Sequence, residues 1–146
     1  MRKTLIFVTC SLLLIFFFSC DKMFVHISGK EADLQGKWKM DDDVVYYNFQ
    51  NSLFQYQMYQ NENQMISGIG YYILNGETHI ELRLLQEHTP DLLVKHLKDD
   101  LKWDVLPSST GKQKQDTIFR IYKIDKFTKK ELILSSDNER LSFYKF

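Results

Sequence analysis

The sequence lacks the strings and the charge balance on which recognisable catalytic or nucleic-acid-binding sites depend. Its 146 residues carry 19 basic and 19 acidic side chains, so no broad basic field exists to attract a phosphate backbone. The strings GxxxxGK followed by Ser or Thr, HExxH and GxSxG are all absent. These absences argue against nucleic-acid binding, P-loop nucleotide binding, zinc proteolysis and esterase chemistry.

Cysteine is scarce and confined to one end of the chain. Cys10 and Cys20 both fall within the first twenty residues. If residues 1–19 are removed and Cys20 is modified, as argued below, no thiol remains for a disulfide, a zinc site or a nucleophile. We therefore expect the remaining chain to be held together by a hydrophobic core, which a chain of this length can build.

The first twenty residues predict an export signal. Arg2 and Lys3 precede an apolar run over residues 5–18, and Ser19-Cys20 follows it. As a helix this run would measure about 21 Å, which is shorter than the roughly 30 Å of a bilayer core. Residues 1–19 are therefore expected to be a signal peptide, with an uncleaved membrane anchor as the alternative.

The end of this segment resembles the lipobox of bacterial lipoproteins. In Phe17-Phe18-Ser19-Cys20 a small residue precedes a cysteine, although the bulky pair departs from the usual Leu and Ala or Ser. The resemblance implies that Cys20 carries a diacylglyceryl thioether, and two or three acyl chains anchor durably. The alternative is an ordinary cysteine beside a standard cleavage site. We expect residues 20–33 to be the lipidated cysteine and a polar tether, and the location to be the bacterial cell envelope, with the outer membrane favoured.

From Leu34 onward the hydrophobic pattern has a period of two. Phe54, Tyr56 and Met58 fall on one face of residues 53–59 with glutamines between them, which predicts a half-buried strand. Asn75-Gly76 predicts a two-residue type I′ turn in which both residues take positive φ. The strands expected are residues 36–40, 44–50, 53–59, 65–74, 78–84, 117–127, 131–135 and 140–146.

Most of these eight strands are joined by short polar turns, which favours an up-and-down antiparallel sheet. Because closure removes unpaired edges, we expect the sheet to form a barrel. One helix interrupts it: Thr89-Pro90-Asp91 supplies an N-cap, a proline at the first helical position and an early acid. Leucines then recur every four residues, which predicts a helix over residues 90–102. Residues 107–115 are expected to be a loop.

Residues 34–146 resemble a lipocalin-like domain. Leu34-Gln35-Gly36-Lys37-Trp38 resembles the Gly-x-Trp opening of lipocalins, and the last three predicted strands resemble the closing strands of lipocalin-like lipoproteins of Gram-negative bacteria. The resemblance implies an all-β barrel in which Gly36 and Trp38 close one end, whereas an ordinary core tryptophan is the alternative. Two features depart from the pattern: no Thr-Asp-Tyr string is present, and the helix lies within the barrel order.

The aromatic content is the best indication of function. After residue 19 the chain retains seven of its 11 Phe, together with eight Tyr and two Trp. Adjacent residues of a strand point to opposite faces, so each tyrosine pair places one ring inward. An eight-stranded barrel is either filled by side chains or holds one small ligand. The inward residues that we expect to line it are Tyr47, Phe49, Phe54, Tyr56, Met58, Tyr71, Ile80, Leu82, Tyr122 and Phe143. Apart from Ile80 and Leu82, they are also our candidate ligand-binding residues.

Catalysis has little support. His79, His88 and His96 are not spaced at i, i+3 or i+4, so no helical metal pair exists, and we expect no catalytic residue, metal or cofactor. An enzyme would require His88, His96 and Asp99 to converge in a cleft. Gly68-Ile69-Gly70 does not match a nucleotide-binding fingerprint and instead fits a bend or bulge in a strand.

These observations predict a membrane-anchored envelope lipoprotein whose lipocalin-like barrel binds a small apolar or amphipathic ligand. The alternative is a membrane-tethered protein-interaction module with a filled barrel. It would use the helix at 90–102, the loop at 107–115 and exposed tyrosines as its contact surface. The expected partners are the membrane, through the N-terminal lipid, and a small ligand or an envelope protein, but no nucleic acid.

Overall fold

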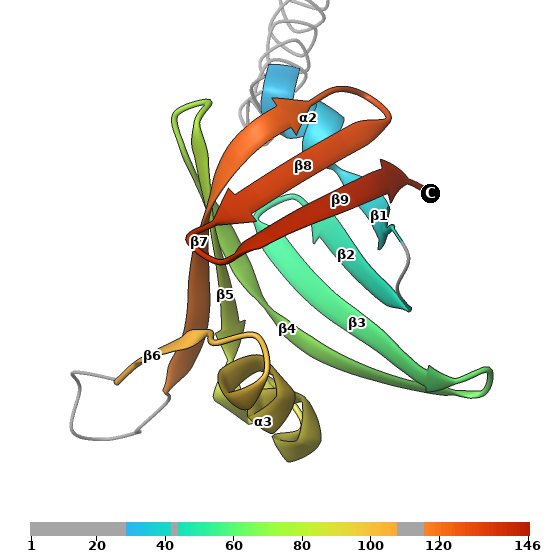
Figure 1. Cartoon of the computed structure of the whole chain (residues 1–146), viewed down its shortest axis with the longest axis vertical. Helices are drawn as coiled ribbons and strands as arrows, with labels where there is room; N and C mark the ends of the chain where they lie inside the picture. The colour runs from blue at the N-terminus through green and yellow to red at the C-terminus, as the bar shows by residue number, and fades with distance from the viewer. Residues whose placement is uncertain (1–28, 42–43, 108–115) are drawn as a thin grey trace, which may run out of the picture.

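The computed structural model describes residues 29–41, 44–107 and 116–146 (Figure 1). The predicted signal peptide over residues 1–19 and the predicted lipidation site Cys20 lie outside the described residues. Within the described part, no helix is both long and apolar enough to cross a membrane.

The described chain forms nine strands and three short helices. Six elements precede the insertion: α2 (Gly29–Leu34), β1 (Gly36–Met40), β2 (Val45–Gln50), β3 (Leu53–Asn61), β4 (Gln64–Asn75) and β5 (His79–Leu85). The 3-10 helix η2 (Gln86–His88), α3 (Asp91–Asp99) and β6 (Asp104–Leu106) make up the insertion, and β7 (Thr117–Phe127), β8 (Glu131–Ser136) and β9 (Glu139–Lys145) follow it. The eight predicted strands are all present, with bounds within two residues of those expected.

Eight of the strands close into an antiparallel barrel. The sheet runs in the order β5-β4-β3-β2-β1-β9-β8-β7, and pairing of β5 with β7 joins its two ends. The ninth strand, β6, pairs with the first residues of β7 and was not predicted. A strand of three residues is too short to show an alternating pattern, so the sequence carried no signal for it. The prediction of an all-β, antiparallel barrel with a helix inside its strand order is confirmed.

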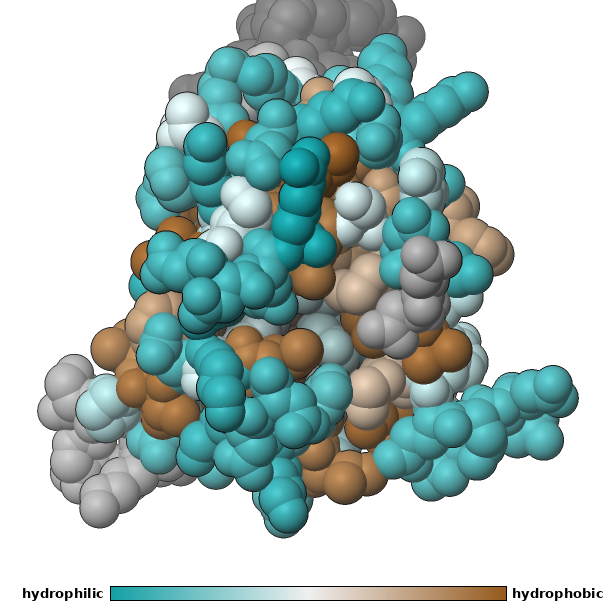
Figure 2. All heavy atoms as spheres, in the orientation of Figure 1, coloured by the Kyte–Doolittle hydropathy of each residue, from teal (hydrophilic) through white to brown (hydrophobic). Residues whose placement is uncertain are grey.

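The barrel interior is built from alternating strand positions. Val45, Tyr47 and Phe49 of β2 are buried, and so are Phe54 and Tyr56 of β3. The residues that are wholly inaccessible include Trp38, Tyr47, Phe49, Phe54, Tyr56, Ile80, Leu82, Tyr122 and Phe143. Hydrophilic residues cover most of the face seen in Figure 2, with hydrophobic residues gathered in smaller areas, one of them over β6.

The prediction that Tyr71 points inward is wrong. Tyr72 is the buried member of the pair, with 5% of its surface exposed, and it lies opposite Leu82 in the register of β4 with β5. Tyr71 lies on the outer face, where its hydroxyl accepts a hydrogen bond from Arg83. The inward positions before Tyr72 are Gly68 and Gly70. Because glycine has no side chain, the sequence of β4 shows no apolar alternation that would indicate which residues point inward.

Helix α2 closes one end of the barrel. The Trp38 indole Nε1 donates a 2.8 Å hydrogen bond to the carbonyl of Leu34, and the Trp38 ring packs against Phe127 with centroids 6.2 Å apart. Gly36, at φ 111°, lies against the Lys145 side chain. Residues 29–33, which we assigned to the tether, are therefore helical and belong to the folded unit.

A polar network ties the start of β1 to the turn between β2 and β3. The Gln35 side chain donates to the Tyr72 hydroxyl at 2.9 Å and accepts a hydrogen bond from the Asn51 amide. The Tyr72 hydroxyl in turn contacts the Asn51 carbonyl and lies 3.2 Å from Glu31 of α2. Because Tyr72 is buried, this network satisfies a hydroxyl that would otherwise be costly inside the barrel.

Helix α3 lies at the opposite end from α2 (Figure 1). The buried residues of α3 are Leu93, Val94 and Leu97. Trp103, which follows the helix, is 3% exposed. The helix begins at Asp91 with Pro90 as its N-cap, so the expected capping by Thr89 is wrong. The Thr89 hydroxyl donates instead to the Leu85 carbonyl at 2.8 Å, because Thr89 is buried against β4 and cannot face the helix end.

The turn between β4 and β5 also differs from its prediction. Asn75 pairs with His79, which leaves Gly76, Glu77 and Thr78 as a three-residue loop. Gly76 takes positive φ, at 64°, whereas Asn75, the last paired residue of β4, does not. The type I′ assignment is therefore wrong, although the hairpin and its left-handed glycine are present.

Gly70 permits a close approach of β5 to β4. A Cβ atom at position 70 would lie 1.9 Å from the Arg83 carbonyl oxygen. We expect Gly70→Ala to lower the free energy of unfolding by about 3 kcal/mol, because rigid backbone would have to move. Urea unfolding followed by circular dichroism measures this loss. Gly29→Ala is the matched control, since nothing lies within 4 Å of its Cβ position. An unchanged midpoint for Gly70→Ala would contradict the close approach.

Candidate functional site

The half of the barrel nearest α2 is filled by aromatic rings. The Tyr47 ring centroid lies 4.5 Å from that of Phe143 and 5.1 Å from that of Phe54. Phe49 lies 5.4 Å from Phe54 and 5.2 Å from Tyr72. Edge and tilted contacts at such distances are typical of packed aromatic cores. Phe49, Phe54 and Phe143, which we listed as ligand-binding candidates, therefore pack against other rings.

Met58 is partly buried and lies outside this packed region. It lines a hollow of about 300 Å³ between β3 and α3, together with Leu92, His96 and Asp99. The His96 Nδ1 lies 2.7 Å from Asp100, whereas His88 pairs with Glu87 and does not reach this hollow. The convergence of His88, His96 and Asp99 that an enzyme would require is not found. Within the described ranges, no three His, Cys, Asp or Glu side chains are grouped to hold a metal ion.

The half of the barrel nearest α3 contains a polar cluster. The Tyr122 hydroxyl donates a 2.8 Å hydrogen bond to Glu139 Oε1, and Arg120 Nε lies 3.8 Å from the same oxygen. The other guanidinium nitrogens of Arg120 donate to the Lys102 carbonyl at 2.8 Å and to the Ser136 hydroxyl at 3.0 Å. Arg120 and Tyr122 are two residues apart on β7, so they share its inward face.

Burial keeps the tyrosines of this cluster neutral. Loss of solvent raises the pKa of Tyr122 well above its usual value, and the Glu139 carboxylate raises it further. Burial likewise raises the pKa of Tyr47, whose hydroxyl lies beside that of Tyr122 without a hydrogen bond of good geometry. Both hydroxyls therefore resist ionisation, and that of Tyr122 donates to Glu139.

Several buried donors in this region lack a hydrogen-bond partner among the described residues. They include the Tyr47 hydroxyl, the Trp103 indole Nε1 and Arg120 Nε, the last of which lies 3.8 Å from Glu139 Oε1. The Trp103 ring lies 6.5 Å from the Tyr122 ring and 6.2 Å from that of Tyr56, which places it beside the polar cluster. Buried polar groups in folded proteins are nearly always paired, so these donors are sites at which an ordered water would recover hydrogen-bond energy.

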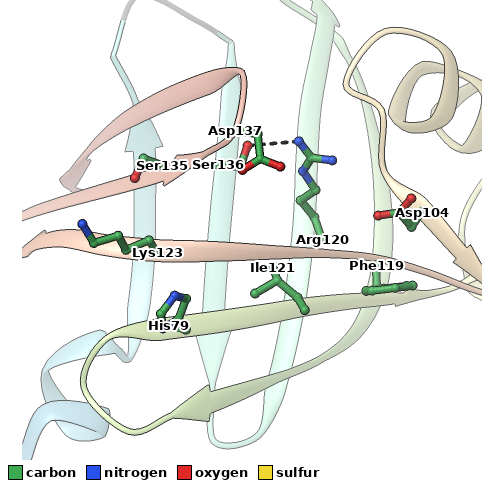
Figure 3. Close-up of a pocket in the computed structure, with 9 residues that line it drawn as sticks. All are labelled: His79, Asp104, Phe119, Arg120, Ile121, Lys123, Ser135, Ser136 and Asp137. Carbon is green, nitrogen blue, oxygen red and sulfur yellow. Dashed lines mark hydrogen bonds between the residues drawn. The ribbon is translucent and has the colours of Figure 1, made fainter.

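A lateral pocket opens beside Arg120 because one edge of β7 is incompletely covered. Strand β6 pairs with residues 117–119 and β8 pairs with residues 123–127, so residues 120–122 pair with neither. The resulting pocket has a volume of about 530 Å³ (Figure 3). Residues that line it include Asp104, Phe119, Arg120, Ile121, Ser136 and Asp137.

The two sides of this lateral pocket differ in character. Arg120 extends from β7 toward Ser136 and Asp137 at the turn between β8 and β9, whereas Phe119 and Ile121 lie on the other side of the strand (Figure 3). Ile121 is 47% exposed, so it offers apolar surface to a bound molecule. The pocket thus joins an apolar wall to a buried polar group, which suits an amphipathic molecule.

The sequence analysis missed Arg120, Trp103 and Glu139 as site residues. Arg120 stands between Ile118 and Tyr122, both buried, so the alternation of β7 did carry a signal that its side chain points inward. Of the residues that were listed, Tyr47, Tyr56 and Tyr122 reach the polar half of the interior. Their role in binding a ligand stays a prediction.

Comparisons with known proteins extend these observations. A family model described as a lipocalin-like domain matches residues 14–146. A solved lipocalin-like protein from Bacteroides uniformis is 23% identical, with a TM-score of 0.58, over 78% of this chain and 99% of that chain. An uncharacterised protein from Bacteroides eggerthii is 20% identical, with a TM-score of 0.55, over 77% and 99% respectively. Both likenesses concern the fold alone. No curated protein matches the chain.

Three buried tyrosines predict a loss of stability in alkali. Burial raises the pKa of Tyr72 to about 12, and the pKa values of Tyr47 and Tyr122 are raised as well. An unfolded tyrosine ionises near pH 10. The stability from these raised pKa values is therefore complete below pH 10 and is lost as the pH rises above it.

We expect the free energy of unfolding to fall between pH 10 and 12, and absorbance at 295 nm to show that these three of the eight tyrosines ionise only on unfolding. Tyr122→Phe should reduce the alkaline loss, whereas Tyr144→Phe, at a half-exposed position, should not. Ionisation of all eight tyrosines in the folded protein would contradict this expectation.

Proposed function

Because the chain belongs to the lipocalin-like domain family, whose model matches residues 14–146, we propose that it is a lipid-anchored bacterial envelope protein that binds a small amphipathic molecule. The binding site in this proposal is the lateral pocket beside Arg120. Lipocalin-like domains are typically binding proteins without enzymatic activity, and the function proposed for this chain is binding without a cofactor.

The lateral pocket is the observation that carries the proposal. Its volume of about 530 Å³ is in the range of small-molecule sites. It places the apolar side chains of Phe119 and Ile121 around the same pocket as the guanidinium of Arg120, whose side chain is 16% exposed. The aromatic packing of the other half of the barrel favours this lateral position over a ligand lying along the barrel axis, because those rings already occupy the interior.

The proposed anchoring rests on Cys20 and on the position of α2. The family model matches residues 14–146, a range that contains Ser19-Cys20. The described chain begins with α2, at the end of the barrel opposite α3 (Figure 1). From Cys20 to Gly29 the chain spans at most about 30 Å when extended. The α2 end would then face the membrane and the α3 end would point away from it.

A protein-interaction function is the second candidate. The filled aromatic half of the barrel favours it, and so do the aliphatic residues on the outer faces of the strands. Leu53, Ile69 and Ile121 are 56%, 43% and 47% exposed, and Leu92 of α3 is 54% exposed. Most of the loop at 107–115, which this hypothesis also invokes, lies outside the described residues. Ligand binding at the lateral pocket distinguishes the two candidates.

Binding at the pocket can be tested on the lipid-free chain from Asp21 onward. The solved relatives are matched over 99% of their length by less than 80% of this chain, which indicates that the barrel folds without the remainder. The probe is 6-propionyl-2-dimethylaminonaphthalene, an uncharged dye whose emission shifts on burial. We expect it to bind and to quench Trp103, which lies beside the polar cluster. Absence of binding would refute the proposed function.

Two matched isoleucine variants locate the bound dye. Ile121 lines the pocket and Ile69 does not, although their exposed fractions are 47% and 43%. We expect Ile121→Lys to weaken binding roughly 5-fold through loss of apolar contact, and Ile69→Lys to leave it unchanged. Fluorescence titration gives both dissociation constants. Equal weakening in the two variants would place the dye elsewhere on the outer surface.

Lipidation can be tested separately from ligand binding. We expect wild-type protein expressed in a Gram-negative bacterium to enter the detergent phase of Triton X-114, and Cys20→Ser to remain in the aqueous phase. Cys10→Ser is the control and should behave as wild type, because Cys10 lies in the predicted signal peptide. Intact mass spectrometry reports the modification directly. Detergent partitioning of Cys20→Ser would contradict the proposed anchor.

A further inference from the structure

We propose that one outer face of the barrel, on β9, β1, β2 and the end of β3, docks on an anionic lipid surface. This inference goes beyond ligand binding, and it rests on the proposed anchoring, which would hold this face beside the bilayer. Tyrosine and lysine are the side chains that proteins place at membrane interfaces. The side chains of this face, called the aromatic-basic face below, are Lys37, Lys39, Tyr46, Tyr59, Tyr144 and Phe146.

The rings of the aromatic-basic face already contact one another. The Tyr46 ring centroid lies 5.5 Å from that of Tyr59 and 6.0 Å from that of Phe146, both edge-on. Lys37 Nζ lies 4.4 Å from the Tyr46 centroid. Phe146 is 82% exposed and Tyr144 is 50% exposed. Because Phe146 packs against the half-buried Tyr46, it can enter an interface with little further loss of conformational freedom.

A hollow of about 130 Å³ opens in the same face. It is lined by Lys39, Val44, Tyr46 and Tyr59. Val44 is 51% exposed, so the hollow offers apolar surface beside a lysine side chain. Apolar groups and negative charge adjoin in the same way at the boundary between the headgroups and acyl chains of an anionic lipid. The hollow therefore suits a lipid better than it suits a free phosphate.

The charge of these strands is complementary to an anionic surface. Strands β1, β2 and β9 carry four basic side chains and one acidic side chain, Glu139, which lies in the polar cluster. Glu131 of β8 lies opposite Tyr144 and is ion-paired with Lys126 at 2.6 Å. By contrast, residues 86–107 at the α3 end carry five acidic and three basic side chains. An anionic surface would therefore attract the aromatic-basic face more strongly than the α3 end.

The proposed anchor would bring this face to the membrane. The Phe146 amide donates a 2.8 Å hydrogen bond to the Lys37 carbonyl, so the face begins at the α2 end of the barrel (Figure 1). Lys130 adds positive charge there, since its carbonyl accepts a 3.0 Å hydrogen bond from the Lys145 amide. From Cys20 to α2 the chain spans at most about 30 Å. Such a short connection raises the effective concentration of lipid, so weak contacts are enough for docking.

Vesicle sedimentation of the lipid-free chain from Asp21 onward tests this inference. We expect the protein to sediment with vesicles of phosphatidylglycerol and phosphatidylcholine in equal parts, and much less with phosphatidylcholine alone. Binding should weaken as salt is added, because salt screens the lysines from the headgroups. Absence of sedimentation with the anionic vesicles, or equal sedimentation with both kinds, would overturn the inference.

Two charge-reversal variants test whether the aromatic-basic face makes the contact. Lys39 lies in this face and Lys98 lies on α3, and both are exposed. We expect Lys39→Glu to weaken binding to anionic vesicles roughly 10-fold, and Lys98→Glu to change it by less than about 2-fold. Equal weakening in the two variants would show that net charge alone drives binding, and would overturn the assignment to this face.

Two apolar variants test the aromatic part of the contact. Phe146 is 82% exposed in this face, and Leu92 of α3 is 54% exposed. We expect Phe146→Ala to weaken vesicle binding roughly 5-fold and Leu92→Ala to leave it unchanged. Circular dichroism checks the fold of each variant. Equal binding by Phe146→Ala and the unsubstituted chain would overturn the role of this ring.

Sedimentation velocity without vesicles tests a second copy of the chain as the other occupant. We expect a monomer. Self-association that Phe146→Ala abolishes, in a chain that does not bind vesicles, would assign the face to a second copy and overturn the lipid surface.

The outcomes separate this inference from the proposed function. Detergent partitioning decides whether Cys20 anchors the protein, and the dye titration decides whether the lateral pocket binds. If both succeed and vesicle binding fails, this inference alone is wrong. If the anchor fails, the inference loses its premise, whatever the vesicles show.

Discussion

The pairing of β5 with β7 is the constraint on which the rest of the structure depends. It runs from His79 opposite Lys123 to Leu85 opposite Thr117, and it turns an open sheet into a closed barrel. The chain between these strands has to leave the barrel, cross its end as η2 and α3, and return. On that return path β6 pairs with residues 117–119 of β7, while β8, which ends at Ser136, pairs with residues 123–127. The lateral pocket lies beside residues 120–122, which neither strand covers.

The interior that this closure creates has two parts with different physical character. Near α2 the rings of Tyr47, Phe49, Phe54 and Phe143 pack against one another, and Trp38 bonds to Leu34 at the end of the barrel. Near α3 the polar cluster of Arg120, Tyr122 and Glu139 lies beside the uncovered strand edge, together with buried apolar residues of α3. Aromatic packing thus supplies the core near α2, and the pocket proposed to bind a ligand lies beside the polar cluster.

Sequence reasoning succeeded where a pattern was local. Alternation located the eight long strands, and the leucine spacing located the inserted helix. It failed where a phase or a contact depended on distant residues. Tyr71 was placed inward because Gly68 and Gly70 offered no side chains to set the phase of β4. Thr89 was predicted to cap the helix because no neighbouring residue in the sequence indicates that Thr89 is buried against β4. Residues 29–33 were read as a tether because their contacts are made with β4 and β9.

The sequence by itself determined the all-β class, the approximate strand bounds and the aromatic nature of the core, because each depends on residues within a few positions of one another. Only the tertiary structure decided which edge of β7 stays open, and which buried donors lack an acceptor. Those properties depend on where β6 and β8 pair along one edge of β7, opposite the edge that β5 occupies. Alternation along a single strand shows which side chains point inward, and it does not show which neighbour will cover the strand's edge.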